Sequence, residues 1–193
     1  MLDHEATRLG DSFLGKPAVP TSMFEFFISS GTDVWQQRDQ FESLVKVFDE
    51  SFARNSVPGG ALMALRTKRW EDLSARRYVG NPNDRFVAAA QSAHVTVALL
   101  SSVVRKGTRE EIEGVLSTPS TQLAVIVMPK EGKPLEDGLA EFLEANSRRF
   151  HYVNTREPPD HFTAVKAMVG IISSAVADAL NPEMTPEPFS EQR

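Results

Sequence analysis

The stretch that decides the fold is His94-Val95-Thr96-Val97-Ala98-Leu99-Leu100. It is apolar on both faces and rich in β-branched residues, which is typical of a central strand in a parallel sheet. A second run of the same kind, Leu123-Ala124-Val125-Ile126-Val127-Met128, ends at Pro129. Between the two runs, residues 108–116 have the apolar spacing of a helix. Two buried strands joined by a helix predict a parallel βαβ unit.

The same alternation of strands and helices extends along most of the chain. Short apolar runs predict three further strands, at residues 23–28, 61–65 and 150–153. Apolar residues three and four positions apart predict four further helices, at residues 33–55, 84–92, 135–147 and 162–180. We therefore expect an α/β fold, a three-layer sandwich around a central parallel sheet of about five strands in the flavodoxin-like order 2-1-3-4-5.

The ends of the chain differ from this middle part. We expect residues 1–22 to form an N-terminal tail, residues 23–180 the domain, and residues 181–193 a disordered C-terminal tail rich in proline and acidic residues. The start of the chain lacks the basic and apolar segments of a signal peptide. The most apolar predicted helix is interrupted by a lysine and an aspartate. These features predict a cytoplasmic protein that does not enter a membrane.

Composition excludes several classes of function. The 193 residues carry a net charge of −5 and form no basic block, so binding to nucleic acid is not expected. The chain has no cysteine, which excludes disulfides, thiolate nucleophiles and thiolate metal sites. The histidines lack the spacing of a metal-binding motif, and they stand at His4, His94, His151 and His161. No metal is therefore expected.

The strand order places the site. In such sheets ligands bind beyond the carboxyl ends of the strands, at the switch point between strands one and three. Four segments are expected at that edge: Ser29–Gly31, Arg66–Glu71, Ser101–Glu111 and Met128–Lys130. Candidate functional residues are therefore sought in these segments and in the helices that follow them.

The first candidate is the segment Gly107-Thr108-Arg109-Glu110-Glu111-Ile112-Glu113. Gly107 permits close approach of the backbone to a ligand, and the start of a helix offers free N–H groups to an anion. Glu111 would project into the crevice from the first turn. The alternative is a capping box, in which Thr108 caps the helix and Glu111 bonds back to it. Both interpretations stay open at this point.

The first predicted strand leads into Ser29, Ser30 and Gly31. Their hydroxyl and N–H groups could hold a phosphate or a ribose hydroxyl. The alternative is a plain turn followed by a helix that Asp33 caps.

Three larger side chains are further candidates. Arg38 could pair with a diphosphate, or else with Glu42 one turn along its helix. Arg69 could meet a phosphate, and Trp70 could stack on a base. The alternative for Trp70 is packing of its loop onto the edge of the sheet.

These segments together resemble a known superfamily. The chain has Phe27-Ile28-Ser29-Ser30, then Asp33 and Arg38, then Arg69-Trp70-Glu71, then residues 107–113. In this order they are similar to motifs of the superfamily that groups nucleoside 2-deoxyribosyltransferases with TIR-type NAD-cleaving domains, and closest to bacterial TIR-like domains of unknown function. The chain departs from that pattern at Lys106, where the relatives usually have serine, and over residues 101–104.

The resemblance implies a TIR-like sheet and cleavage of an N-glycosidic bond in a nucleotide. It implies an NAD⁺ glycohydrolase, a hydrolase that acts as a bacterial antiviral defence effector, with NAD⁺ as substrate and no cofactor. Glu111 would be the catalytic carboxylate that stabilises positive charge on the sugar. Nicotinamide leaves as a neutral group and needs no general acid, which favours NAD⁺ over an ordinary nucleoside. The implied substrate-binding residues are Ser29, Ser30, Gly31, Arg38, Arg69, Trp70, Gly107 and Thr108.

Two other functions stay open. One is a non-catalytic nucleotide-sensing or protein-interaction module of the same fold, and the other is a nucleoside 2-deoxyribosyltransferase. The expected partners are a nucleotide and either a second copy of the chain or a regulatory protein. The last predicted helix carries small residues at Ala167, Gly170, Ser173, Ser174 and Ala175. They would permit close packing on a second subunit or, alternatively, on the parent sheet.

Overall fold

Strands and helices alternate along the chain as predicted. The computed structural model describes residues 21–52, 62–74, 80–129, 133–147, 149–154 and 161–181. Its elements are β1 (Thr21–Ser30), the 3₁₀ helix η1 (Thr32–Val34), α1 (Trp35–Phe52), β2 (Leu62–Arg69), α2 (Trp70–Ser74), α3 (Pro82–Ser92), β3 (Val95–Leu100), α4 (Lys106–Leu116), β4 (Gln122–Val127), α5 (Asp137–Asn146), β5 (His151–Asn154) and α6 (His161–Leu180).

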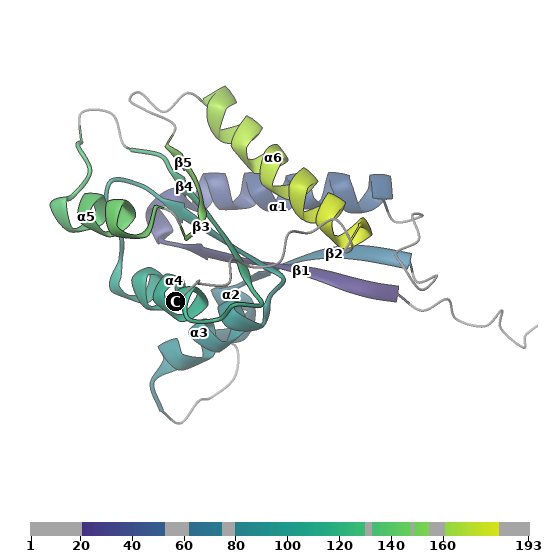
Figure 1. Cartoon of the computed structure of the whole chain (residues 1–193), viewed down its shortest axis with the longest axis horizontal. Helices are drawn as coiled ribbons and strands as arrows, with labels where there is room; N and C mark the ends of the chain where they lie inside the picture. The colour runs from purple at the N-terminus through teal and green to yellow at the C-terminus, as the bar shows by residue number, and fades with distance from the viewer. Residues whose placement is uncertain are drawn as a thin grey trace, which may run out of the picture.

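The strands form one parallel sheet of five strands in the order β2-β1-β3-β4-β5, which confirms the predicted fold class. β1 lies between β2 and β3, with Ile28 opposite Arg69 and Ser30 opposite Leu99. The carboxyl ends of these three strands therefore meet at one edge of the sheet. Figure 1 shows this edge facing the starts of α1 and α4.

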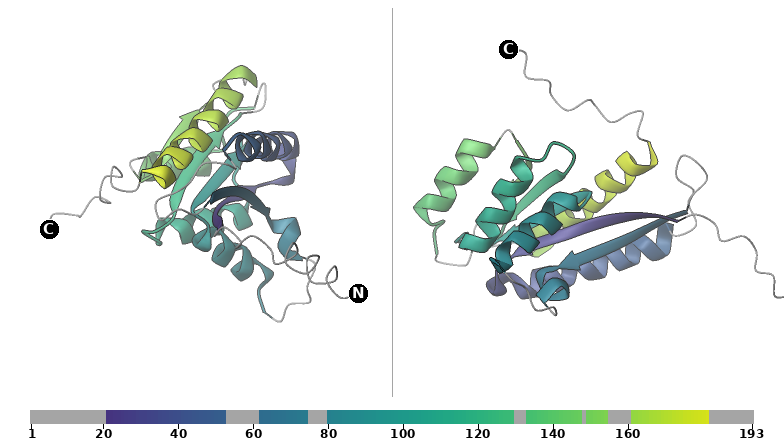
Figure 2. Two further views of the ribbon diagram at one scale, coloured as in Figure 1. Left: turned by 90° about the vertical axis from the view of Figure 1, so that its right-hand side faces the viewer. Right: turned by 90° about the horizontal axis from the view of Figure 1, so that it is seen from below.

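Helices cover both faces of the sheet. α1 and α6 lie on one face and α3, α4 and α5 on the other (Figures 1 and 2). Successive residues of β1 divide between the faces, because side chains alternate along a strand. Phe26 and Ile28 pack against α1 and α6, whereas Phe27 packs against α3 and α4. All three side chains are fully buried, and the predicted three-layer sandwich is confirmed.

The last helix packs on the parent sheet. α6 is long and apolar enough, by length and composition, to cross a membrane, and one third of its apolar stretch is buried here. Met168 and Ile172 are fully buried against the sheet and α1. Gly170, Ser173 and Ser174 are exposed. Packing on the parent sheet, one of the two predicted arrangements, is therefore what the described residues show.

Two short segments were not predicted. β2 continues through Arg66–Arg69, which was expected to be a loop, since the alternating charged residues Arg66 and Lys68 reach Glu25 on β1. The strand then passes directly into α2, a helix of five residues whose apolar pattern is too short to detect.

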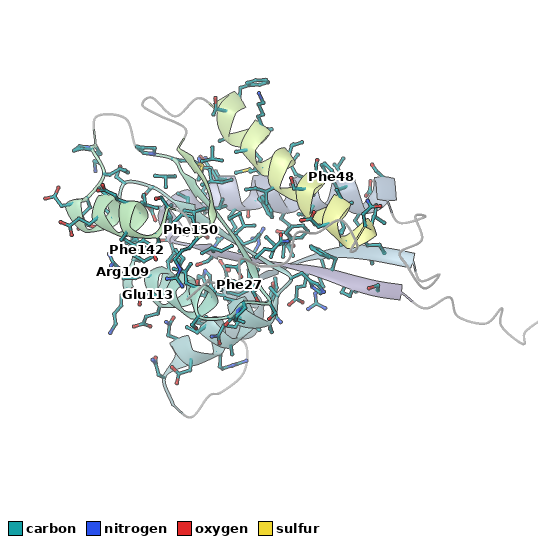
Figure 3. The ribbon with its side chains drawn as sticks, in the orientation of Figure 1. Phe27, Phe48, Arg109, Glu113, Phe142 and Phe150 are labelled. Atoms are coloured by element: carbon teal, nitrogen blue, oxygen red, sulfur yellow. The ribbon has the colours of Figure 1, made fainter. Side chains whose placement is uncertain are left out.

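α4 is fixed between α3 and α5. Arg109 lies over the ring of Phe142 at 5.2 Å and donates a hydrogen bond to the Gly138 carbonyl at 3.2 Å. On the other side, Gln91 of α3 donates to the Gly114 carbonyl at 3.1 Å. Figure 3 shows Arg109 and Phe142 facing one another between α4 and α5. The helix that carries Glu111 is therefore held from both flanks.

Candidate functional site

Glu111 is the buried carboxyl group at the carboxyl edge of the sheet. It lies on the second turn of α4 and is only 6% exposed. The Ser29 hydroxyl, from the end of β1, donates a hydrogen bond to Glu111 Oε2. Ser29 is fully buried on the face of the sheet that α3 and α4 cover. The structure thus brings together two predicted site residues that are 82 positions apart.

Burial changes the acidity of this carboxyl group. Loss of water raises the pKa of Glu111 from 4.5 to about 7, with a further increase from the nearby charge of Glu110, while the Ser29 hydrogen bond acts in the opposite direction. A carboxyl group with this pKa is present in both protonation states near neutral pH, which suits proton transfer.

The predicted capping box is wrong. α4 begins at Lys106 with Arg105 as its N-cap, so Thr108 lies inside the helix and cannot cap it. Gly107 does allow a close approach, since a Cβ atom there would lie 3.1 Å from Asn83 Oδ1. The group that approaches Gly107 is therefore a side chain of α3, and substrate binding by Gly107 and Thr108 stays a prediction.

Asp33 does not cap the first helix either. Gly31 is the N-cap of η1, so Asp33 lies inside that helix and is not its cap residue. Instead, Asp33 accepts a hydrogen bond from the Ser101 hydroxyl and has its Oδ1 atom 3.6 Å from Arg105 Nε. The Asp33 carboxylate therefore links the loop after β1 to the loop after β3, at the switch point of the sheet.

Arg38 and Arg69 form a second charged cluster, between α1 and the end of β2. Arg38 Nη1 lies 2.7 Å from Glu71 Oε1, so the predicted pairing of Arg38 with Glu42 is wrong. Arg69 Nη2 instead pairs with Glu42 and lies 2.9 Å from Asp39 Oδ1. Sequence reasoning missed Asp39. Its spacing of three residues from Glu42 on one helix face was the available signal.

The aromatic candidate Trp70 packs against a neighbouring helix. Trp70 begins α2 and packs edge-on against Phe86 of α3, with ring centroids 6.4 Å apart. Trp70 therefore has a packing role, as in the alternative prediction, although its partner is a helix and not the edge of the sheet. Trp35 is 53% exposed at the start of α1. Lys130 lies outside the described residues.

Among the described residues, no three or more histidine, aspartate or glutamate side chains form a group that could hold a metal ion. The site is instead built from carboxyl, hydroxyl and guanidinium groups. Such groups exchange protons and bind polar or charged molecules by hydrogen bonds.

Comparison with known proteins gives matches in fold alone. No protein-family model and no curated protein matches the sequence. Among solved structures, a rubredoxin oxygen:oxidoreductase from Desulfovibrio gigas matches with a TM-score of 0.44 and 12% identity over 86% of this chain and 38% of its own. The described chain thus spans less than half of that protein.

Two smaller proteins match over nearly their whole length. An oxidoreductase from Corynebacterium diphtheriae has a TM-score of 0.45 and 14% identity, covering 82% of this chain and 98% of its own. A flavodoxin-like domain from Synechococcus has a TM-score of 0.37 and 10% identity, covering 79% and 99%. These values describe a shared flavodoxin-like fold and bring no activity to this chain.

The matches correct the resemblance drawn from the motifs. The structures above are flavodoxin-like and oxidoreductase folds, not TIR-like domains or nucleoside 2-deoxyribosyltransferases. Assignment to that superfamily was therefore wrong, and so were the functions that it implied: the NAD⁺ glycohydrolase, the deoxyribosyltransferase, the TIR-like sensing module and the antiviral role. The prediction that no cofactor is needed depended on that superfamily and is withdrawn with it.

Proposed function

We propose that the carboxyl edge of the sheet is an acid–base site in which Glu111 exchanges a proton with a small polar substrate. The observation that supports this is the Glu111 carboxyl group, buried, bonded to the Ser29 hydroxyl and with a pKa raised to about 7. Burial of an ionisable group costs free energy unless it is compensated. A shifted pKa at the switch point of an α/β sheet is a physical reason to place function there.

The contacts of Glu111 support this chemistry. In its ionised form, Glu111 accepts the Ser29 hydrogen bond at Oε2, and its second oxygen takes a proton from the substrate. In its protonated form, the same oxygen returns a proton. Ser29 fixes the direction of the carboxyl group, and the contacts of Arg109 with α5 fix the helix that carries it. Such positioning of a group whose pKa is near the working pH supports general acid–base catalysis.

The loop that follows β1 does not have the groups that a flavin phosphate would need. In flavodoxin-like sheets the ligand lies at the β1/β3 switch point, and a helix start favours a phosphate. In this chain the Asp33 carboxylate lies there, bonded to Ser101. A Cβ atom on Gly31 would clash with Asp33 Oδ1, so the carboxylate fills the space above the loop. The loop thus presents an acceptor that is already paired with Arg105, where a flavin phosphate needs hydrogen-bond donors, and we derive no step through a flavin.

The test compares the wild-type chain with Glu111→Gln, which keeps the side-chain shape but cannot exchange the proton. Each protein is incubated with a deproteinised extract of small metabolites, and the mixture is analysed by mass spectrometry. We expect at least one compound to be consumed by the wild type and not by Glu111→Gln. The rate should follow the titration of a group with a pKa of about 7.

Glu113→Gln is the matched control, because Glu113 is an exposed glutamate on the same helix. It should act like the wild type. The proposal is wrong if no compound is turned over by the wild type across the titration range, or if Glu111→Gln turns it over equally well.

Three broader predictions belong with this proposal. We propose that residues 23–180 are the functional domain, with residues 1–22 and 181–193 as tails, and that the protein is cytoplasmic. The described helices and strands all lie within or next to these domain limits. Limited proteolysis followed by mass measurement checks the domain limits, since cleavage should concentrate at the two ends.

A further inference from the structure

A second polar cluster lies on the opposite face of β1 from Glu111, in the layer between the sheet and α1. Side chains alternate along strands, so Arg69 shares the face of β2 on which Met63 and Leu65 pack against α1. By the same rule, Ser30 shares the face of β1 on which Ile28 packs. Since Ile28 is paired with Arg69 in the sheet, Ser30 and Arg69 end neighbouring strands on the same face.

Several buried polar atoms in this layer lack a hydrogen-bond partner. Arg38 enters the layer from α1 and is 7% exposed, and its ion pair with Glu71 is close but poorly aligned for a hydrogen bond. Among the described residues, no acceptor is bonded to Arg38 Nε, Arg38 Nη1 or Arg69 Nε. The Ser30 hydroxyl, on a residue that is 8% exposed, is likewise unbonded. Glu71 Oε2 in the same layer is an unbonded acceptor, but the unbonded donors outnumber it. Buried polar groups are normally satisfied, so this excess of donors indicates a place for a further acceptor.

The charged side chains of the layer show which counter-ion a bound anion would have to replace. Arg38 and Arg69 supply two positive charges, while Glu71, Asp39 and Glu42 supply three negative ones. Asp39 and Glu42 both contact Arg69 Nη2 and leave its Nε unbonded. Glu71 is the counter-ion of Arg38, and its side chain is 37% exposed at the start of the short helix α2. A bound anion would add to the negative charge of this layer. The layer can accept it only if the Glu71 carboxylate turns toward solvent and leaves Arg38 to the anion.

We propose that Ser30, Arg38 and Arg69 form an anion-binding subsite for a carboxylate or phosphate group of the substrate. Glu71 is the internal counter-ion that holds this subsite when no ligand is bound. Guanidinium groups form strong, charge-assisted hydrogen bonds with both kinds of anion, and the Ser30 hydroxyl supplies one more donor. The inference rests on the proposed function only where it assigns the anion to the substrate of Glu111; the anion binding itself is independent of that site.

Trp70 offers a direct reporter of binding, because it stands between Arg69 and Glu71 in the chain and packs against Phe86. The chain has two tryptophans. Replacing the exposed one, Trp35→Phe, leaves Trp70 as the sole source of indole fluorescence. Inorganic phosphate and acetate are titrated separately into the full-length protein, with sodium chloride keeping the ionic strength constant. The comparison of the two titrations distinguishes a phosphate group from a carboxylate.

We expect a saturable change in Trp70 fluorescence with at least one of the two anions. Glu71→Gln should tighten binding about 10-fold, because it removes the competing carboxylate and leaves the donors in place. Arg38→Gln should abolish the response, and Arg38→Lys should restore part of it. Arg66→Gln is the matched control, since Arg66 lies on the same strand but is exposed and pairs with Glu25. It should bind like the parent protein.

The inference is overturned if neither anion gives a saturable response with the Trp35→Phe parent protein, nor with Glu71→Gln made in that parent. It is also overturned if Arg38→Gln responds like the parent, or if Arg66→Gln loses the response equally. Glu111→Gln should leave anion binding unchanged. Retained anion binding without any Glu111-dependent turnover would therefore refute the proposed function alone. Glu111-dependent turnover without anion binding would refute this inference alone.

Discussion

The two ends of the sheet are built on different principles. At the amino ends of β3 and β4 a cavity of about 240 Å³ lies beneath α6, and its walls are mainly apolar, including Val95, Leu123 and Ile171. Most of the buried polar side chains of the described residues gather at the carboxyl ends: Ser29, Ser30, Arg38, Ser101, Ser102, Thr108 and Glu111. Apolar burial stabilises the fold, whereas buried polar groups cost free energy unless they are well bonded. Stability should therefore depend on the first region and activity on the second.

The largest expected effect is loss of packing beneath α6. Ile172→Ala removes a fully buried side chain that packs on the sheet. The free energy of unfolding should fall by about 2–5 kcal/mol, because burial is lost and a cavity remains. Ser173→Ala, at the neighbouring exposed position, should change it by less than about 0.5 kcal/mol. Denaturant unfolding measures both. Equal effects at the two positions would mean that α6 does not pack in this register.

The next effect concerns the carboxyl end and depends on pH. The pKa of Glu111 is raised in the folded protein from 4.5 to about 7, so the folded state binds more protons than the unfolded state between these values. This contribution to stability is complete below about pH 4.5 and is lost as pH rises through about 7. Glu111→Gln lacks this dependence. Its stability relative to the wild type should therefore increase by about 3 kcal/mol between acidic and mildly alkaline pH.

Chemical denaturation over a pH series measures this difference. Glu113→Gln serves as the control, because it keeps Glu111 and its Ser29 contact, and its stability should vary with pH like that of the wild type. A constant difference between Glu111→Gln and the wild type at all pH values would show that the Glu111 carboxyl group is not buried as described.

The middle of the sheet could be predicted from sequence, because the residues of each central strand are sufficient to identify it. β3 and β4 are apolar on both faces, which specifies buried parallel strands without knowledge of the rest of the chain. The short helix α2 could not be predicted, because five residues are too few to show a period. The two helix starts were misjudged for a related reason: Thr108 and Asp33 are good caps in isolation, but contacts from distant strands determine where they lie.

Prediction of the site was limited by pairings that are distant in the sequence. The sheet order placed Ser29 and Glu111 at one edge, and the structure brings them into contact. The sequence could not show that Arg38 would choose Glu71 over Glu42, since side-chain partners depend on how α1 lies on β2. Motif order proved a poor guide to the family, because short motifs of serine, glycine and glutamate recur wherever strands lead into helices.

The smallest effect compares two helical glycines, one on α6 and one on α4. A Cβ atom on Gly170 of α6 meets no atom within 4 Å. Gly170→Ala should therefore raise the free energy of unfolding by up to about 1 kcal/mol, because alanine is the better helix former. On α4, a Cβ atom on Gly114 would lie 2.5 Å from Val87 Cγ1. Gly114→Ala should thus lower stability by about 1–2 kcal/mol despite the same gain in helix propensity. Thermal and denaturant unfolding of the two variants measures both signs. If Gly114→Ala stabilised the protein as Gly170→Ala does, α3 would not hold α4 closely, and the fixed position of Glu111 would lose its support.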